Sequence, residues 1–273
     1  MPVLSGEEVE RFVADGFEHL EGAFDRETAA ACVDELWAAS GIDRHDRSAW
    51  TSPVLRVAGS RSAPFVAAIN TDRLCGAIDD LVGPGRWQRR TGYGTFPIRF
   101  PSEADPGDAG WHMDGSYRLD DEPPPWNLGL NLWSKGRALL LLMLFSDVGD
   151  DDVPTRIRVG SHRDVTAALV PLGERGANFG EVTRRSHAFM DRPVAYATGR
   201  AGDVYLCHPF LVHAASWPHR GTSPRFIGQP CIHHHESMDR FEYGRIEGEH
   251  SACERAVLLA LEQAGVDMPA EGR

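Results

Sequence analysis

The sequence has almost no lysine and no long apolar run. Lys135 is the only lysine, so arginine carries nearly all the positive charge, and the formal net charge is still −12. A chain with this negative balance is not expected to bind nucleic acid or an anionic membrane surface. No stretch approaches the roughly 20 apolar residues that a membrane-spanning helix needs. Nucleic acid and the bilayer are therefore not expected partners.

Cysteine is also scarce and scattered. The five cysteines are odd in number and never form a Cys-x-x-Cys pair, which excludes a disulfide framework or a zinc site of the usual spacing. The first eight residues lack the basic start and apolar core of a signal peptide. We therefore expect a cytoplasmic protein. The 273 residues contain no linker or repeat and predict one domain over 1–273.

Hydrophobic periodicity predicts helices mainly toward the two ends of the chain. Ser5 and Glu8 form a capping box before the first of them, and glycines follow the first two. Residues 43–62 are polar and are expected to form a solvated loop. The predicted helices run from Ser5 to near Gly16, from Asp25 to Gly41, over 63–81 with a break near Asn70, and around 253–261.

Short β-forming segments dominate after Trp87. The continuous apolar run 139–145 has the length of a strand that is buried on both faces. The other predicted strands cover residues 17–24, 90–100, 155–159, 194–197, 203–208 and 226–229. This pattern predicts a mainly β, cupin-like jelly-roll barrel over 87–235, with helical support over 1–86 and a C-terminal segment with a helix over 236–273.

The motif His112-x-Asp114 places an imidazole and a carboxylate two residues apart. In an extended chain these side chains point to the same face and converge on one point. Histidine with a carboxylate suits iron better than a metal that prefers thiolates. A histidine that is hydrogen-bonded to a carboxylate on a surface turn would give the same pattern, so a metal site requires a further ligand.

A facial triad needs a second histidine from elsewhere in the chain. The downstream candidates are His162, His187, His208, His213, His219, His233, His234 and His235. The three consecutive histidines alternate faces in a strand and are expected at the surface or the barrel mouth. His162 is expected to be a structural hydrogen-bond partner, and His208, which precedes a proline, a core histidine. His213 is followed by small residues that leave space beside a metal, and it is our third ligand.

Arg225 begins an apolar strand after a turn-rich segment that follows His213. A hairpin-like return would bring it beside the strand that carries His213. An arginine in this position is costly to bury unpaired, and a bidentate carboxylate would satisfy it. The carboxylate belongs either to a ligand or to an Asp or Glu of the protein.

His112-x-Asp114, His213 and Arg225, in this order, resemble the metal ligands and the arginine of the phytanoyl-CoA dioxygenase family. Residues 202–206 resemble the family's Gly-Asp entry to the strand with the distal histidine. Residues 159–162 resemble its Pro-Gly-Ser-His turn, with Val159 in place of the proline. The resemblance runs from the N-terminal helix to about residue 232.

The resemblance implies a double-stranded β-helix fold and an iron(II)/2-oxoglutarate-dependent dioxygenase. His112, Asp114 and His213 would hold Fe(II), and Arg225 would pair with the distal carboxylate of 2-oxoglutarate. This co-substrate and O2 would be converted to succinate and CO2 while a substrate is oxidised. Arg99 would help to hold a carboxylate of co-substrate or substrate, with a surface salt bridge as its alternative role.

The sequence departs from the family where a small hydroxyl residue often follows the distal histidine. That place is taken by Ala215, and Ser216 comes one residue later as the candidate for the hydrogen bond to the co-substrate. Asp114 is retained, whereas halogenating relatives have glycine or alanine, so we expect hydroxylation or another oxidation. Candidates for lining the substrate pocket, with core packing as the alternative, are Tyr93, Tyr117 and Trp133.

Two other functions remain open. A cupin-like metalloenzyme would not use 2-oxoglutarate and would not need an arginine at position 225. A barrel that binds a small ligand would contain no iron. For the oxygenase we expect a small metabolite or natural-product intermediate, because an acyl-CoA would favour a basic entrance and the sequence shows no obvious basic cluster. The acidic turn of Asp147 and residues 150–152 is expected to be solvated, and the oligomeric state is not predicted.

Overall fold

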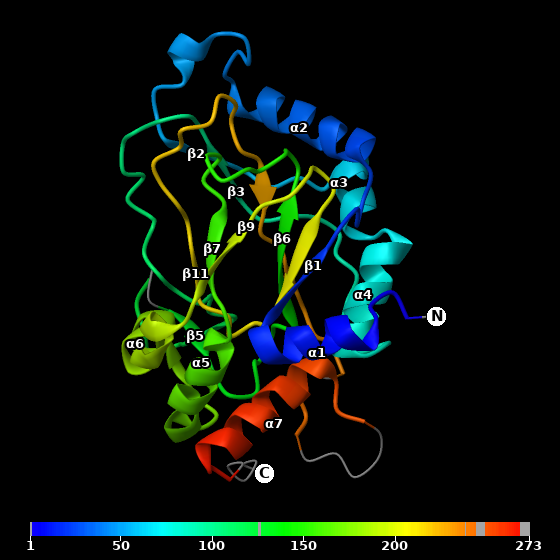
Figure 1. The fold of residues 1–273 in the computed structure, drawn as a ribbon, viewed down its shortest axis with the longest axis vertical. Coiled ribbons are helices and arrows are strands. Elements are labelled where there is room, and N and C mark those ends of the chain that lie inside the picture. Colours follow the sequence, from blue (N-terminus) through cyan, green and yellow to red (C-terminus); the bar gives the residue numbers. More distant parts are fainter. Residues whose placement is uncertain (1, 125–126, 238, 244–248, 268–273) are drawn as a thin grey trace.

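The structure is a computed structural model that describes residues 2–124, 127–237, 239–243 and 249–267. Antiparallel strands form its centre and helices surround them (Figure 1). The α-helices are α1 (Gly6–Asp15), α2 (Arg26–Ser40), α3 (Ala63–Ile69), α4 (Asp72–Val82), α5 (Ser161–Leu169), α6 (Phe179–Arg185) and α7 (Ala252–Ala264). The strands are β1 (Phe17–Leu20), β2 (Val54–Val57), β3 (Phe96–Arg99), β4 (Tyr117–Arg118), β5 (Leu128–Leu130), β6 (Leu139–Leu144), β7 (Thr155–Arg158), β8 (Ala177–Asn178), β9 (Val194–Ala197), β10 (Val204–Cys207), β11 (His213–Ala214), β12 (Ile227–Gly228) and β13 (Cys231–Ile232).

The helix predictions for the N-terminal region and the C-terminal helix are confirmed. The Ser5 side chain accepts from the Glu8 N–H, and the Glu8 carboxylate accepts from the Ser5 N–H at 2.6 Å, which completes the capping box of α1. Gly16 ends α1 at φ +84°, a conformation that glycine adopts without strain. Helices α5 and α6 were not predicted. The N-cap of α5 is Gly160, which offers no side-chain acceptor, so the usual start signal is missing there.

Strand β6 lies at the centre of the main sheet, whose order is β1-β10-β6-β12, with β13 also paired to β6. A second sheet has the order β11-β7-β9. Leu140, Leu142 and Leu144 pack in an apolar cluster with Ile157 and Ala197 of the second sheet. The alternate residues of β6 pack in a larger cluster with side chains of α1, α2, α3, α4 and α7. The prediction of a strand buried on both faces is therefore confirmed.

The antiparallel pairing agrees with the predicted fold class. Two smaller sheets pair β2 with β3, and β4 with β5 and β8. Among the described residues these pairings form four sheets, so closure into one barrel stays a prediction. Strand β2 lies in a segment that we predicted to be a loop, and of the strand predicted at 90–100 only Phe96–Arg99 forms. Since β2 is stabilised by pairing with β3, about 40 residues away, its own sequence carries little local signal.

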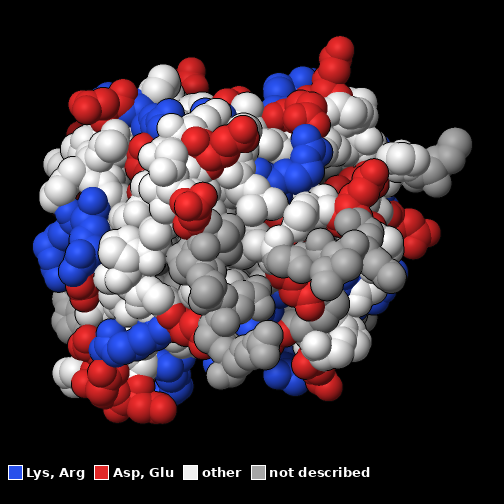
Figure 2. All heavy atoms as spheres, turned by 90° about the horizontal axis from the view of Figure 1, so that it is seen from below, with Lys and Arg blue, Asp and Glu red and all other residues white. Residues whose placement is uncertain are grey.

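Acidic and basic side chains are interspersed in small groups over the face shown in Figure 2. No broad area of one sign covers that face. Among the residues that the structure describes, no helix has both the length and the apolar character needed to cross a bilayer.

His208 is fully buried and hydrogen-bonded, as predicted for a core histidine. Its Nε2 lies 3.2 Å from the Cys253 carbonyl oxygen, and its Nδ1 accepts from the Phe210 N–H at 3.1 Å, so the neutral ring is satisfied. Burial lowers the pKa of His208 to about 3. Burial, with His208 as a neighbour, also lowers the pKa of the buried His162 well below its usual range.

This burial predicts a loss of stability in mild acid. The unfolded chain takes up protons on these imidazoles as the pH falls below about 6.5, whereas the folded chain does not until far lower pH. Each such histidine should reduce the free energy of unfolding by about 1.4 kcal/mol per pH unit between about pH 6 and pH 4. Urea unfolding across this range measures the slope. His208→Gln, which keeps a donor and an acceptor, should make the free energy of unfolding depend less steeply on pH. An equal slope in wild type and variant would contradict the conclusion that buried His208 stays neutral in the folded chain.

Candidate metal centre

His112 and His213 are brought together by a reciprocal pair of backbone hydrogen bonds. The His112 N–H donates to the His213 carbonyl oxygen at 3.0 Å, and the His213 N–H donates to the His112 carbonyl oxygen at 2.9 Å. The second histidine begins β11, which pairs with β7 through His213 and Ile157. The two imidazole rings consequently lie side by side, with centroids 4.5 Å apart.

Both rings are oriented in the same way by a carbonyl group two residues earlier. Nδ1 of His112 lies 2.9 Å from the Gly110 carbonyl oxygen, and Nδ1 of His213 lies 3.1 Å from that of Leu211. Because a carbonyl oxygen only accepts, each Nδ1 carries the proton and each Nε2 presents a lone pair. Both Nε2 atoms lie 3.9 Å from Oδ1 of Asp114.

The predicted triad is therefore gathered at one place. One ligand atom from each of the three side chains lies within 4.8 Å of the other two. Two imidazole nitrogens and one carboxylate oxygen on one side of a site form the donor set that non-haem Fe(II) prefers. Burial lowers the pKa of His213 to about 4, so that its imidazole is the neutral, ligating form near neutrality.

Arg137 orients the carboxylate of Asp114 and was missed by the sequence analysis. Its Nη1 donates to Oδ2 of Asp114 at 2.8 Å, and its Nη2 donates to the Gly115 carbonyl oxygen at 3.0 Å. Oδ1 is left to face the two histidines. Burial alone would raise the pKa of Asp114, but Arg137 and the two imidazoles hold it well below its usual range. Arg137 precedes a buried strand just as Arg225 does, and this signal could have identified it.

We expect Arg137→Gln to weaken metal binding about 10- to 100-fold, as is common when the partner of a ligating side chain is removed. Titration of the metal-free protein with Co(II), followed by its visible absorption bands, measures the affinity and the ligand geometry together. Arg137→Lys keeps the charge and should recover part of the affinity. Equal Co(II) affinity in wild type and Arg137→Gln would show that Asp114 is oriented without this contact.

A cavity of about 400 Å³ opens beside the triad and contains both buried arginines of the prediction. Arg225 donates to the Val153 carbonyl oxygen at 2.6 Å, while its buried Nε has no partner. Its backbone pairs with that of Arg99, which binds Asp108 through Nη2 at 2.8 Å. Among the described carboxylates none forms an ion pair with Arg225. Burial and the neighbouring Arg99 lower the pKa of Arg225 to about 9, and Asp108 in the same cavity wall only partly opposes this.

The other predicted site residues lie elsewhere. The Ser216 hydroxyl donates to the Pro154 carbonyl oxygen at 2.5 Å, and Ser216 lines a different hollow. Tyr93 packs against Phe65 and Phe96, and its hydroxyl contacts the Met143 sulfur at 3.1 Å. These two residues therefore do not face the cavity.

Tyr117 and Trp133 are likewise absent from the cavity wall. The Tyr117 hydroxyl donates to the Arg175 carbonyl oxygen at 2.6 Å, and Trp133 is buried in the larger apolar cluster. The alternative role of core packing holds for Tyr93 and Trp133. The walls instead include six residues that the sequence analysis did not select: Arg56, Thr95, Pro97, Asp108, Thr155 and Gln229.

The run of three histidines alternates in its surroundings, as expected for an extended chain. His234 is buried, with Nε2 3.2 Å from the Ser134 carbonyl oxygen, and His235 is exposed. His233 is partly buried, with Nε2 3.5 Å from the Cys231 sulfur. The run is thus not a chelating unit, although the prediction of a surface position is wrong for His234.

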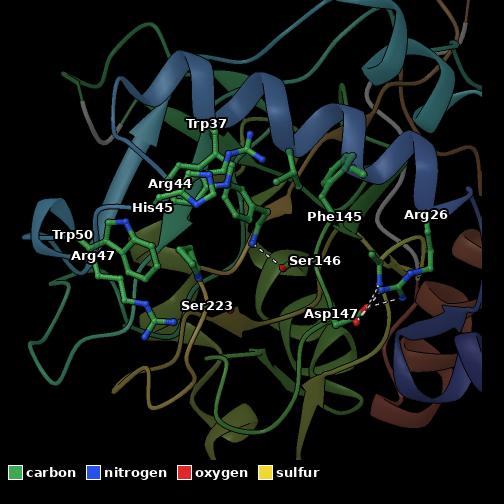
Figure 3. Close-up of a pocket in the computed structure, with 15 residues that line it drawn as sticks. Arg26, Trp37, Arg44, His45, Arg47, Trp50, Phe145, Ser146, Asp147 and Ser223 are labelled. Atoms are coloured by element: carbon green, nitrogen blue, oxygen red, sulfur yellow. Dashed lines mark hydrogen bonds and ion pairs between the residues drawn. The ribbon is translucent and has the colours of Figure 1, made fainter.

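A larger hollow of about 630 Å³ lies under α2 and contains none of the triad (Figure 3). Arg44 and Arg47 lie over the rings of Trp37 and Trp50 there, at 5.9 and 5.5 Å from the ring centroids. At its other end Arg26 forms two hydrogen bonds with Asp147, so this part of the acidic turn is ion-paired and not only solvated.

Comparison with solved structures identifies the fold of the chain. No family model matches the sequence, and no curated protein matches it. The structure is similar to the epimerase SnoN in complex with Fe3+, alpha ketoglutarate and nogalamycin RO, at 19% identity and TM-score 0.55, over 83% of this chain and 81% of that one. The chain shares its fold.

Two further solved structures support this conclusion. The non-heme alpha ketoglutarate dependent carbocyclase SnoK from nogalamycin biosynthesis is 16% identical over 85% of each chain, with a TM-score of 0.54. HygX from Streptomyces hygroscopicus, with nickel, 2-oxoglutarate and hygromycin B bound, is 18% identical over 92% of this chain and 96% of that one, with a TM-score of 0.54. The alpha ketoglutarate of these names is 2-oxoglutarate.

Proposed function

We propose that the protein is a non-haem Fe(II)/2-oxoglutarate-dependent oxygenase that oxidises a C–H bond of a small molecule. The observation that carries the proposal is a single cavity lined by His112 and His213 of the triad and by a buried arginine, Arg225, that forms no ion pair with a carboxylate that the structure describes. A metal-binding barrel of another class would need the triad but not the arginine. A small-ligand binder would need neither.

The residues fit the two groups that the proposal requires. His112, Asp114 and His213 would hold Fe(II), and Arg225 would pair with the distal carboxylate of 2-oxoglutarate, supported by the charge of Arg99. When bound, iron, 2-oxoglutarate and O2 supply oxidative decarboxylation to succinate and CO2, coupled to oxidation of the substrate. Arg137 keeps one carboxylate oxygen of Asp114 free for the metal, and Ile157, which pairs with His213, belongs to the apolar cluster between the sheets.

Hydroxylation is the outcome that we propose, because Asp114 occupies the place that halogenating relatives leave open. Structures of this fold include an epimerase and a carbocyclase, so the same site chemistry serves other outcomes in them. SnoN and HygX were crystallised with nogalamycin RO and hygromycin B, which supports a metabolite or natural-product intermediate as the substrate here. We also propose the double-stranded β-helix barrel and membership of the phytanoyl-CoA dioxygenase family.

The test uses the metal and the co-substrate before any substrate is known. Under anaerobic conditions, Fe(II) and 2-oxoglutarate added to the protein should give a weak metal-to-ligand charge-transfer band that neither gives alone. Metal binding without this band would indicate the metalloenzyme that does not use 2-oxoglutarate. Absence of metal binding would indicate the small-ligand binder. A panel of small molecules screened for stimulated succinate formation then identifies the substrate class.

A further inference from the structure

A hollow of about 200 Å³, separate from the metal cavity, gathers three arginines. Arg61 follows β2, and Arg89 and Arg90 precede β3, so the three come from segments that are far apart in the sequence. His233 forms another part of the wall. The sequence shows no obvious basic cluster because these arginines come together only in the folded chain.

Within the described part of the chain the three arginines have no carboxylate partner. Arg89 donates to the Asn70 carbonyl oxygen and Arg90 to that of Gly92, both at 3.3 Å, and none of the three forms an ion pair with a carboxylate that the structure describes. Arg99 and Arg137, by contrast, each have a carboxylate partner. In a chain of net charge −12, three unpaired guanidinium groups around one small hollow form a local anion-binding environment.

Side chains on one face of the segment from Arg225 to His233 form a row that passes the metal cavity. The arginine hollow lies at the His233 end of this row. Arg225 and Gln229 line that cavity, and Cys231 lies opposite Leu140, whose side chain is in the cluster between the sheets. His233 contacts Cys231 on the same face, with Nε2 and Sγ 3.5 Å apart. With a rise of about 3.3 Å per residue, Gln229 and His233 are roughly 13 Å apart along this row.

A second segment makes the same connection. Gly92 and Tyr93 line the arginine hollow, and Thr95 and Pro97, directly after them, line the metal cavity. The backbone at 92–97 and the row from Gln229 to His233 thus each run from the arginine hollow to the wall of the metal cavity. Arg225 provides positive charge at the opposite end of the row.

We propose that Arg61, Arg89 and Arg90 bind an oxyanion, a carboxylate or phosphate group, of the substrate. The assignment to a substrate rests on the function proposed above. It gives the substrate class as an anionic small molecule that reaches from the metal cavity to the arginine hollow, whose wall residues Gln229 and His233 lie on the order of 13 Å apart along this row. Arg225 receives the co-substrate's carboxylate at one end, and the three arginines receive the substrate's anion at the other.

Anion binding is tested first, on the metal-free protein and without any substrate. Inorganic phosphate and acetate are titrated by calorimetry and, for phosphate, by 31P NMR. The double variant Arg61→Gln/Arg89→Gln alters two exposed side chains and should bind either probe at least about tenfold more weakly. Arg118→Gln removes an exposed arginine of β4 that lines neither hollow and should bind as wild type does. Failure of the wild type to bind, or equal binding by the double variant, would overturn the proposal.

The substrate assignment is tested with matched pairs of a carboxylic acid and its uncharged amide in the succinate assay. The acid should be the better substrate, and the double variant should raise KM for the acid with little change in kcat, because the contact is made equally in the ground and transition states. Equal rates for acid and amide would overturn the assignment. If the protein fails to bind 2-oxoglutarate, the oxygenase function falls, and the phosphate titration still decides whether the oxyanion pocket exists.

Discussion

Replacing His213 by alanine is expected to abolish metal binding and, with it, turnover of 2-oxoglutarate. His213 would supply one of the three ligand atoms, and it is the most buried of the three side chains, with its Nδ1 fixed by the Leu211 carbonyl group. Loss of a side chain that only orients a ligand costs about 10- to 100-fold in metal affinity. Loss of a ligand itself should lower the metal affinity by more than about 100-fold.

The measurement is calorimetric titration with Co(II) or Fe(II), with circular dichroism to confirm the fold. His235→Ala is the matched control, because His235 is exposed and belongs to the run of three histidines that looks like a metal site in the sequence. The control should bind metal as the wild type does. The opposite pattern, with binding lost in His235→Ala and kept in His213→Ala, would move the metal site from the triad to the histidine run.

Replacing Arg225 by methionine should nearly eliminate 2-oxoglutarate binding and leave metal binding intact. In the complex the guanidinium group would pair with a carboxylate inside a buried cavity. Removing one partner of such a pair costs about 3–5 kcal/mol because the other charge is left without compensation. The affinity for 2-oxoglutarate, measured by calorimetry in the presence of Co(II), should therefore fall by more than about 100-fold.

The same substitution should have an opposite effect on the protein without ligand. Arg225 is a buried charge that forms no ion pair with any carboxylate in the described part of the chain, and an apolar side chain of similar length removes the cost of burying that charge. The free variant should be at least as stable as the wild type. At 100 times the dissociation constant, 2-oxoglutarate should stabilise the wild type by about 2.7 kcal/mol and the variant hardly at all. Strong destabilisation of the free variant would mean that Arg225 has a structural role instead.

Features that depend on local patterns were predictable from the sequence. The capping box at Ser5, the glycine after α1 and the apolar run of β6 act through neighbours within a few residues. The spacing of His112 and Asp114 fixed their common direction in the same way. The choice of His213 over His208 followed from the residues around each, and the structure places His208 in the core.

Features that depend on distant partners were not predictable in the same way. Strand β2 exists because β3 pairs with it, and Arg137 contacts Asp114, 23 residues earlier, only because the chain between them returns through β4 and β5. Tyr93 and Trp133 are of the residue types expected in a pocket wall, but burial in the core stabilises aromatic side chains just as well. Ser216 follows Ala215 by one residue, and in an extended strand one residue is enough to turn a side chain to the other face.

The paired backbone hydrogen bonds between His112 and His213 couple metal binding at this site to the stability of the strand pairing there. Any ion held by both imidazoles acts as a cross-link between segments about 100 residues apart, and closing so long a loop carries a substantial entropic cost in the unfolded chain. Separation of β11 from the segment at His112 would break the coordination and the backbone pairing in a single event. The lifetime of the bound ion is consequently tied to how often this one strand contact opens, and the amide hydrogens of His112 and His213 report that opening by their rate of exchange with solvent.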